Sequence, residues 1–279
     1  MVGAIIGVAC AAVVLGLWGL FESQWVRCDE RELEVPGLPA ELDGFRLLHV
    51  SDLHLGAFSL AWLGARRAGY WLAGHEFDLV AITGDLVSAR RGVPRLTEFL
   101  ATLRADLGVI AVLGNHDVSV TRDPFSSAKG AAFDEFEHMT LLRDSAALVT
   151  RGSVSIRVAG LDALSYLRGA TDPSTLTGSE DFRILLSHYP TAVDRASPDS
   201  FELVLAGHMH GGQICLPTPR GKLRLAHPGA PYPEGVYSVH DGETTLVVSR
   251  GLGTTFVPFR LLARPELTAF TLRAPTVAE

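Results

Sequence analysis

The sequence predicts an α/β fold whose second half is rich in strands. Short runs of β-branched and aliphatic residues end at Gly, Asp, His or Asn, which is typical of buried strands that lead into functional loops. Helical patterns separate the early runs and favour an α/β fold, whereas the later runs follow one another without helices between them. The buried strands are expected at residues 45–51, 77–83, 108–114, 155–160, 182–188 and 201–207.

An uncharged run at residues 2–21 comes before these strands. As a helix rising 1.5 Å per residue it would measure ~30 Å, the thickness of the hydrocarbon layer of a bilayer. No Lys or Arg precedes it, unlike the start of most cleaved signal peptides. Trp18, Phe21 and Trp25 lie where the helix would leave the hydrocarbon, as an aromatic belt does. We expect residues 1–24 to be an uncleaved single-pass anchor in the cell membrane.

The side of the membrane is left open by the sequence. Arg27 and Arg31 follow the apolar run and no basic residue precedes it, so the positive-inside rule leans toward a cytoplasmic position for the rest of the chain. Residues 25–44 mix charges with Pro and Gly, which predicts a juxtamembrane connection that includes one short strand.

The remaining elements follow from local patterns. Helices are expected at residues 60–73, 94–105 and about 126–139, and Pro94 suits the first turn of the second. Three later strands are expected at residues 237–240, 244–249 and 267–272. Because the chain shows neither a fixed-period repeat nor a low-complexity tract, residues 45–279 are expected to form one domain.

Charge and cysteine content exclude some classes of protein. Lys and Arg number 24 and Asp and Glu number 31, giving a net charge of −7. Binding along a nucleic-acid backbone relies on a surplus of basic residues, so no nucleic-acid partner is expected. The three cysteines (Cys10, Cys28 and Cys215) are too few and too scattered for a disulfide framework or a zinc knuckle.

Polar residues cluster where the predicted strands end. In extended backbone, residues i and i+2 point to the same face, so the D-x-H and H-x-H patterns can aim both side chains at one ion. Carboxylate, amide and imidazole ligands suit Mn²⁺, Fe or Zn²⁺, and these clusters hold enough of them for two ions that share one carboxylate. The clusters lie at residues 51–54, 84–85, 114–117, 187–188 and 207–212.

These clusters carry a family resemblance. The series DLHLG, GDLV, GNHD, SHYP and GHMHGGQ resembles the calcineurin-like metallophosphoesterase superfamily in order and approximate spacing. The tail SRGLGTTFVPFRLLARPELTAFTL is similar to small bacterial membrane-associated phosphodiesterases of the UDP-2,3-diacylglucosamine pyrophosphatase type. The resemblance covers about residues 30–272. It implies a four-layer α/β/β/α sandwich of two mixed β-sheets, with residues 45–279 as the catalytic domain.

The resemblance also implies the ligands of two divalent metal ions. A hydroxide bound to the metal pair would then attack the phosphorus atom of a phosphoester. The implied ligands are Asp52, His54 and His210 for the first ion and Asn115, His188 and His208 for the second, with Asp85 as the bridge.

By the same resemblance, His116 binds no metal and faces the oxygen of the leaving group, to which it would donate a proton. Asp117 would orient and charge the ring, as carboxylates do for catalytic imidazoles. We therefore expect these two residues to be catalytic. The other histidines (His49, His75, His138, His227 and His240) are expected to be structural or on the surface.

A missing arginine restricts the expected class of substrate. Protein phosphatases of this superfamily grip phosphate with an arginine in a D-x-V-D-R-G pattern, and residues 85–90 (DLVSAR) lack it. This favours diesters or pyrophosphates over monoesters. Arg250 and Arg260 flank a glycine-rich GLG loop and are expected either to clamp the substrate or to form surface ion pairs.

Apolar stripes at residues 58–72 and 256–262 suit either a buried core or a rim that contacts lipid. A lipid-linked phosphoester is therefore one expected substrate, and the oligomeric state stays open. The alternatives are a phosphomonoesterase, a nuclease, or a membrane-tethered metal-binding scaffold without activity. The residues His116 and Asp117 argue against the scaffold, since a purely structural site would not require them.

Overall fold

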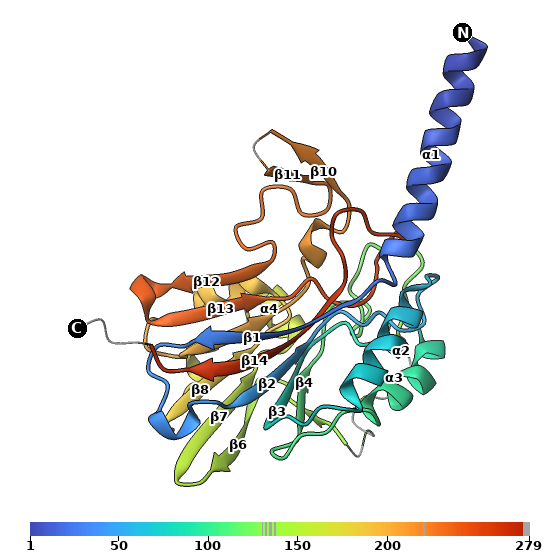
Figure 1. Ribbon diagram of the computed structural model, residues 1–279. Coiled ribbons are helices and arrows are strands. Elements are labelled where there is room, and N and C mark those ends of the chain that lie inside the picture. The colour runs from blue at the N-terminus through green and yellow to red at the C-terminus, as the bar shows by residue number, and fades with distance from the viewer. Residues whose placement is uncertain (130, 132, 134–135, 137, 220, 276–279) are drawn as a thin grey trace.

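Two six-stranded mixed sheets form the centre of the computed structural model, which describes residues 1–275 apart from 130, 132, 134–135, 137 and 220 (Figure 1). The first sheet has the order β1 (Arg27–Glu34), β14 (Glu266–Arg273), β2 (Arg46–Val50), β3 (Leu79–Thr83), β4 (Val109–Val112) and β5 (Thr140–Leu141). The second has the order β12 (Gly235–Val239), β13 (Thr244–Val248), β9 (Leu203–Ala206), β8 (Phe182–Leu186), β7 (Val154–Gly160) and β6 (Ser145–Arg151).

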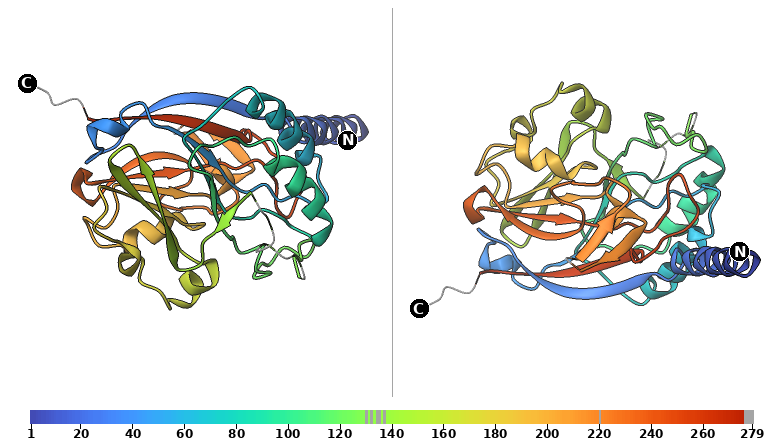
Figure 2. Two further views of the ribbon diagram at one scale, coloured as in Figure 1. Left: turned by 90° about the horizontal axis from the view of Figure 1, so that it is seen from below. Right: turned by 90° about the horizontal axis from the view of Figure 1, so that it is seen from above.

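Helices cover the outer faces of the two sheets, and Figure 2 shows the layers from two sides. Apolar residues of β2, β3 and β4 on one face pack against α2 (Ala61–Leu72) and α3 (Val93–Leu100). A second core lies between the sheets, and a third packs the far face of the second sheet against α4 (Ala163–Arg168) and the 3₁₀ helix Pro190–Arg195. The four-layer α/β/β/α prediction is therefore confirmed. Strand β3 is buried throughout, as a strand covered on both faces must be.

The parallel strands set the position of the functional loops. Strands β2, β3 and β4 run parallel in the first sheet, and β7, β8, β9 and β13 run parallel in the second. Their carboxyl ends therefore lie at one edge of each sheet, where ligand sites form in open α/β folds. The clusters predicted from the sequence follow β2, β3, β4, β8 and β9.

Two segments differ from the local prediction. The stretch at residues 25–44 contains one strand, as expected, but this strand, β1, pairs in parallel with β14 over its whole length and so belongs to the first sheet rather than to a separate connection. The helix predicted at 126–139 is wrong for the described residues of that range, because Ser127 instead pairs with Ala89 and its N–H donates to the Ser88 carbonyl oxygen. The other residues of that range lie outside the described part.

Helix α1 (Val2–Glu22) projects from the domain (Figure 1). Its apolar side chains are mostly exposed. It is the one helix among the described residues that is long and apolar enough to cross a membrane. A separate two-stranded hairpin, β10 (Cys215–Thr218) with β11 (Gly221–Arg224), projects on the same side of the domain.

Candidate metal centre

The loops that follow the strands hold their polar side chains in an unusual backbone conformation. Asp52, His54, Asp85, His208 and His210 all have positive φ, between 45° and 72°. For residues other than glycine this conformation costs free energy and is concentrated at functional sites. The turns therefore aim these side chains inward at the expense of local backbone stability.

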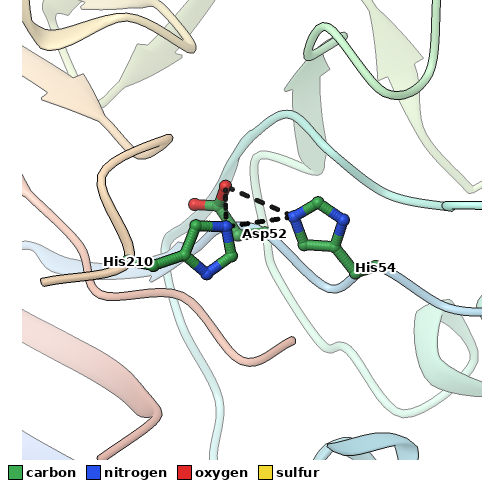
Figure 3. A group of neighbouring side chains, drawn as sticks. All are labelled: Asp52, His54 and His210. Atoms are coloured by element: carbon green, nitrogen blue, oxygen red, sulfur yellow. Dashed lines mark hydrogen bonds and ion pairs between the residues drawn. The ribbon is translucent and has the colours of Figure 1, made fainter. Parts of the chain in front are cut away.

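One group of donors comes from the loop after β2 and the loop after β9. Figure 3 shows Asp52, His54 and His210 pointing toward one another. Nε2 of His210 lies 3.4 Å from Oδ1 of Asp52 and 3.1 Å from Nε2 of His54, and all three side chains are buried. Ligand atoms from three chain positions thus meet within one ion's reach.

A second group lies beside it. Nε2 of His188 is 3.1 Å from Oδ1 of Asn115 and 3.1 Å from Nδ1 of His208. Asp85 is shared between the groups, because its Oδ2 is 3.3 Å from Nε2 of His188 and 3.4 Å from Nε2 of His54. The structure thus brings every metal ligand expected from the sequence to one place.

The second nitrogens of two rings are tied to the protein. Nδ1 of His54 lies 2.8 Å from the hydroxyl oxygen of Ser88, and Nδ1 of His188 lies 2.9 Å from the carbonyl oxygen of Thr83. A carbonyl can only accept, so Nδ1 of His188 carries a proton, and Nε2 is the ring atom directed at the Asp85 and Asn115 oxygens. Both rings are therefore oriented with Nε2 toward the centre.

Close packing makes glycine necessary next to the ligands. A Cβ on Gly207, immediately before His208, would lie 1.9 Å from the Ser51 hydroxyl oxygen and 2.4 Å from Oδ2 of Asp52. Only glycine lets the loop after β9 approach the loop after β2 this closely. The first glycine of the GHMHGG sequence, Gly207, is therefore required by the close approach of the two loops.

Burial determines the charge of the donors. It lowers the pKa of His54 to about 3 and the pKa of His208 and His210 well below their ordinary value, so these rings are neutral and can donate lone pairs. Burial, together with the nearby Asp85 carboxylate, raises the pKa of Asp52 to about 6. Burying carboxylates close together is costly unless a cation joins them. Neutral imidazoles with buried carboxylate and amide oxygens fit divalent metal ions.

His116 lies beside both groups, with its ring centroid 4.6 Å from that of His54. One of its ring nitrogens lies within 4.8 Å of ligand atoms of His54 and Asp85, so these three residues could also hold an ion. However, Nδ1 lies 2.7 Å from the hydroxyl oxygen of Ser126, and Nε2 is 3.2 Å from Oγ1 of Thr121 and 3.3 Å from Oγ1 of Thr255. Both ring nitrogens of His116 therefore have hydroxyl partners in the protein.

The expected contact between Asp117 and the His116 ring is wrong. The Asp117 carboxylate instead accepts backbone N–H groups from Leu86 and Val87, which follow Asp85, and from Gly114. Burial and the Asp85 charge raise the pKa of Asp117 to about 7. Asp117 therefore links the loops after β3 and β4, and Ser126 takes the ring-orienting position.

The guanidinium groups of Arg250 and Arg260 both contact protein acceptors. Arg250 is paired with Glu266, at 2.5 Å, and with Glu234, at 3.3 Å. Arg260 is completely buried and donates to backbone carbonyl oxygens, among them Gly253 and Ala263. Arg250 thus forms ion pairs, the alternative expected to a clamp, whereas Arg260 is buried against backbone acceptors.

Arg260 instead supports the metal centre from behind. One of its N–H groups donates to the His210 carbonyl oxygen at 3.3 Å, and Nη2 lies 3.0 Å from Nδ1 of the same ring. Nothing local in the sequence distinguishes this buried arginine from a surface one.

His227, expected as structural or on the surface, is exposed with its ring centroid 4.8 Å from that of His208. The sequence around His227 gave no signal for this position, because it follows none of the predicted strands.

Comparisons with known proteins agree with this geometry. Residues 45–212 match the model of the calcineurin-like phosphoesterase family. The chain is 31% identical to the uncharacterized metallophosphoesterase YkuE of Bacillus subtilis (strain 168), over 91% of this chain and 87% of that protein.

Two other relatives have more informative names. A transmembrane protein with metallophosphoesterase domain from Danio rerio is 32% identical, over 93% of this chain and 60% of that one. The UDP-2,3-diacylglucosamine pyrophosphatase LpxG of Chlamydia trachomatis serovar D is 26% identical, over 93% of both chains. The apolar helix α1 and the likeness to this transmembrane protein indicate that the chain is associated with a membrane. The chain belongs to the calcineurin-like phosphoesterase family and is a metal-binding phosphoric ester hydrolase.

Proposed function

We propose that the chain is a phosphodiesterase or pyrophosphatase that uses two divalent ions and acts on a small or lipid-linked phosphoester. The observation that carries the proposal is the position of Asp85, whose Oδ2 lies within 3.4 Å of a nitrogen from each donor group. Paired ions in hydrolases lie ~3.5–4 Å apart and share such a ligand.

The proposed ligands are divided between the two positions. Mn²⁺, Fe or Zn²⁺ suits this mixture of donors. Such a pair of ions supplies charge stabilisation at phosphorus and lowers the pKa of a coordinated water toward ~7. The proposed ligands are Asp52, His54 and His210 at one position and Asn115, His188 and His208 at the other, with Asp85 between them.

His116 is the proposed proton donor to the leaving group. Ser126 holds its Nδ1 at 2.7 Å, which leaves Nε2 toward Thr255 and the cavity that this threonine lines. The backbone N–H of His116 also donates to Oδ1 of Asp85 at 2.9 Å, so the ring is fixed relative to the bridging carboxylate. Asp117 is a supporting residue in this proposal.

The preference for diesters or pyrophosphates rests on cationic groups. A monoester dianion depends most on additional positive charge, and the DLVSAR run after β3 has no arginine at the position where phosphatases of the superfamily carry one. Arg250 and Arg260 are paired with protein groups. The charge that a monoester needs is therefore not supplied by these two residues.

The lipid-linked substrate rests on the likeness to LpxG and on the membrane association. In this proposal α1 crosses the cell membrane once, residues 1–24 are the anchor, and residues 45–279 form the catalytic domain, to which β1 adds an edge strand.

The test is metal analysis of the purified full-length protein followed by parallel assays. Bis-p-nitrophenyl phosphate, p-nitrophenyl phosphate, DNA and a nucleotide diphosphate linked to an acylated sugar serve as substrates. We expect two ions per chain and faster cleavage of the diester or the pyrophosphate. Faster cleavage of the monoester would instead favour the phosphomonoesterase, and DNA degradation the nuclease. A metal-loaded protein inert toward all four would favour the non-catalytic scaffold.

A further inference from the structure

The last turn of α1 is packed into the domain. A Cβ on Gly19 would lie 3.0 Å from Cβ of Phe259 and 3.1 Å from the carbonyl oxygen of Arg260. The backbone N–H of Arg260 donates to the Gly19 carbonyl oxygen at 3.1 Å. The helix and the segment after the GLG loop thus touch backbone to backbone, which a side chain at position 19 would prevent.

Glu22 adds a buried carboxylate to this contact between α1 and the domain. Its Oε1 accepts the backbone N–H of Ala263 at 2.8 Å, and its Oε2 accepts the indole N–H of Trp18 at 3.0 Å. A buried carboxylate needs such partners, so the contact is specific. The direction of α1 is therefore fixed by the domain, and a bilayer crossed by α1 lies against the side from which the helix projects (Figure 1).

Exposed aromatic side chains gather next to this contact. Phe256 lies three residues before Phe259 and is 51% exposed, while Phe58 is 82% and Phe125 68% exposed. These three rings line one cavity of about 230 Å³, together with Val257 and other residues. Loops from three distant parts of the chain thus form one apolar surface.

The surface continues toward the β10–β11 hairpin. A second cavity, of about 350 Å³, shares Phe256 and Val257 with the first and extends to Leu225. Leu216 and Leu223 on the hairpin are exposed as well. In Figure 1 this hairpin projects on the same side as α1.

Both cavities border the metal centre. The first is lined by Ser88 and Thr255, which contact the rings of His54 and His116. The second is lined by His227, whose ring lies beside His208. The apolar surface is therefore next to residues that contact the metal centre on two sides.

We infer that this surface, the apolar rim (Phe58, Phe125, Leu216, Leu223, Leu225 and Phe256), rests in the interfacial layer of the bilayer, so that the metal centre meets phosphoester groups at the membrane surface. A contiguous exposed apolar patch marks a contact surface, and aromatic rings favour the interface between lipid and water. The inference rests on the proposed anchor and is independent of the proposed reaction.

Fluorescence quenching by nitroxide lipids tests the rim. The full chain, with Cys10→Ala, carries either Phe58→Cys or Phe256→Cys, labelled with an environment-sensitive fluorophore in phosphatidylcholine–phosphatidylglycerol vesicles. Labelling is selective because Cys215 is buried and burial raises the pKa of the Cys28 thiol to about 11. Leu148→Cys on β6 and Val236→Cys on β12 are matched controls, since both are exposed apolar residues away from the rim segments.

We expect severalfold stronger quenching at positions 58 and 256 than at 148 and 236. Equal quenching at all four positions would overturn the inference. A label on the native Cys10, which is exposed within α1, reports insertion of the anchor separately. If that label is quenched and the rim labels are not, the apolar rim does not contact the bilayer, but the proposed anchor does cross it. An unquenched Cys10 label overturns both, and the hydrolase assays are affected by neither result.

Discussion

Oδ2 of Asp85 lies 3.3 Å from Nε2 of His188, although the two residues follow strands of different sheets. The contact joins the two halves of the sandwich at their carboxyl edges. The negative charge of Asp85 acts on the neighbouring ring: burial alone would lower the pKa of His188, yet the Asp85 carboxylate raises it to about 9. The buried Asp85 carboxylate therefore favours a positive charge beside it.

Replacing this carboxylate should remove the metal. Asp85→Asn keeps the size of the side chain but loses the charge shared by the two donor groups, so we expect metal content to fall to that of chelator-treated protein. Elemental analysis after gel filtration measures it. Asp106→Asn is the control, since Asp106 is exposed and belongs to neither donor group. Full retention of metal by Asp85→Asn would contradict the bridging assignment.

His116→Ala should separate chemistry from metal binding. Loss of a general acid lowers turnover by ~10²–10⁴-fold. We expect this loss in kcat with metal content unchanged, because Ser126 and Thr255 rather than an ion hold the ring. The effect should be smallest with a leaving group as acidic as p-nitrophenol, which needs little protonation. Loss of metal in parallel with kcat would make His116 a ligand instead.

Arg260→Met should destabilise the fold far more than Arg250→Met. Arg260 is fully buried and supplies donors to the carbonyl oxygens of His210, Gly253 and Ala263. An unsatisfied buried acceptor costs about 1–3 kcal/mol. The ion pairs of Arg250 are partly exposed and worth less. Thermal unfolding in detergent compares the two, and equal melting temperatures would remove the supporting role of Arg260.

The sequence was sufficient for the strands that follow a local pattern and for the donors at their ends. Asp52, Asp85 and His188 each stand where a buried run stops, so their convergence follows from parallel strands. Pairings between distant segments were not visible in the same way. The partner of β1 is β14, at the other end of the chain, and no local pattern encodes that choice.

The wrong predictions for Asp117 and for residues 126–139 have the same physical cause. Asp117 is adjacent to His116 in sequence, but the turn after β4 directs its carboxylate to the backbone N–H groups of Leu86 and Val87. The pattern at about 126–139 predicts a helix, yet Ser127 donates its N–H to the Ser88 carbonyl oxygen and pairs with Ala89 as in a strand. In both cases a backbone group from another loop outcompetes the local preference, and this competitor cannot be identified without the fold.

His49 should make stability depend on pH. Burial lowers its pKa to about 3, and its Nε2 lies 2.9 Å from Oγ1 of Thr83. Below pH ~6.5 His49 binds a proton in the unfolded chain but stays neutral in the folded protein. The free energy of unfolding therefore falls as the pH decreases. At pH 5 this amounts to about 2 kcal/mol for one such histidine. His49→Gln should therefore lose less stability than wild type between pH 7.5 and pH 5. The melting temperature at the two values measures this, and identical slopes would show that His49 is protonated in the folded state.

Gly19→Leu should disturb the domain although the residue lies in the apolar helix. The added side chain collides with Phe259, and the shift reaches Arg260 and, through it, His210. Overpacking of this kind costs about 1–3 kcal/mol. We expect a lower melting temperature and weaker metal retention during dialysis. Gly16→Leu, in the same helix, is the matched control, because nothing lies within 4 Å of a Cβ there. If the two variants behave alike, α1 is a loose tether and its direction does not determine which face of the domain meets the bilayer.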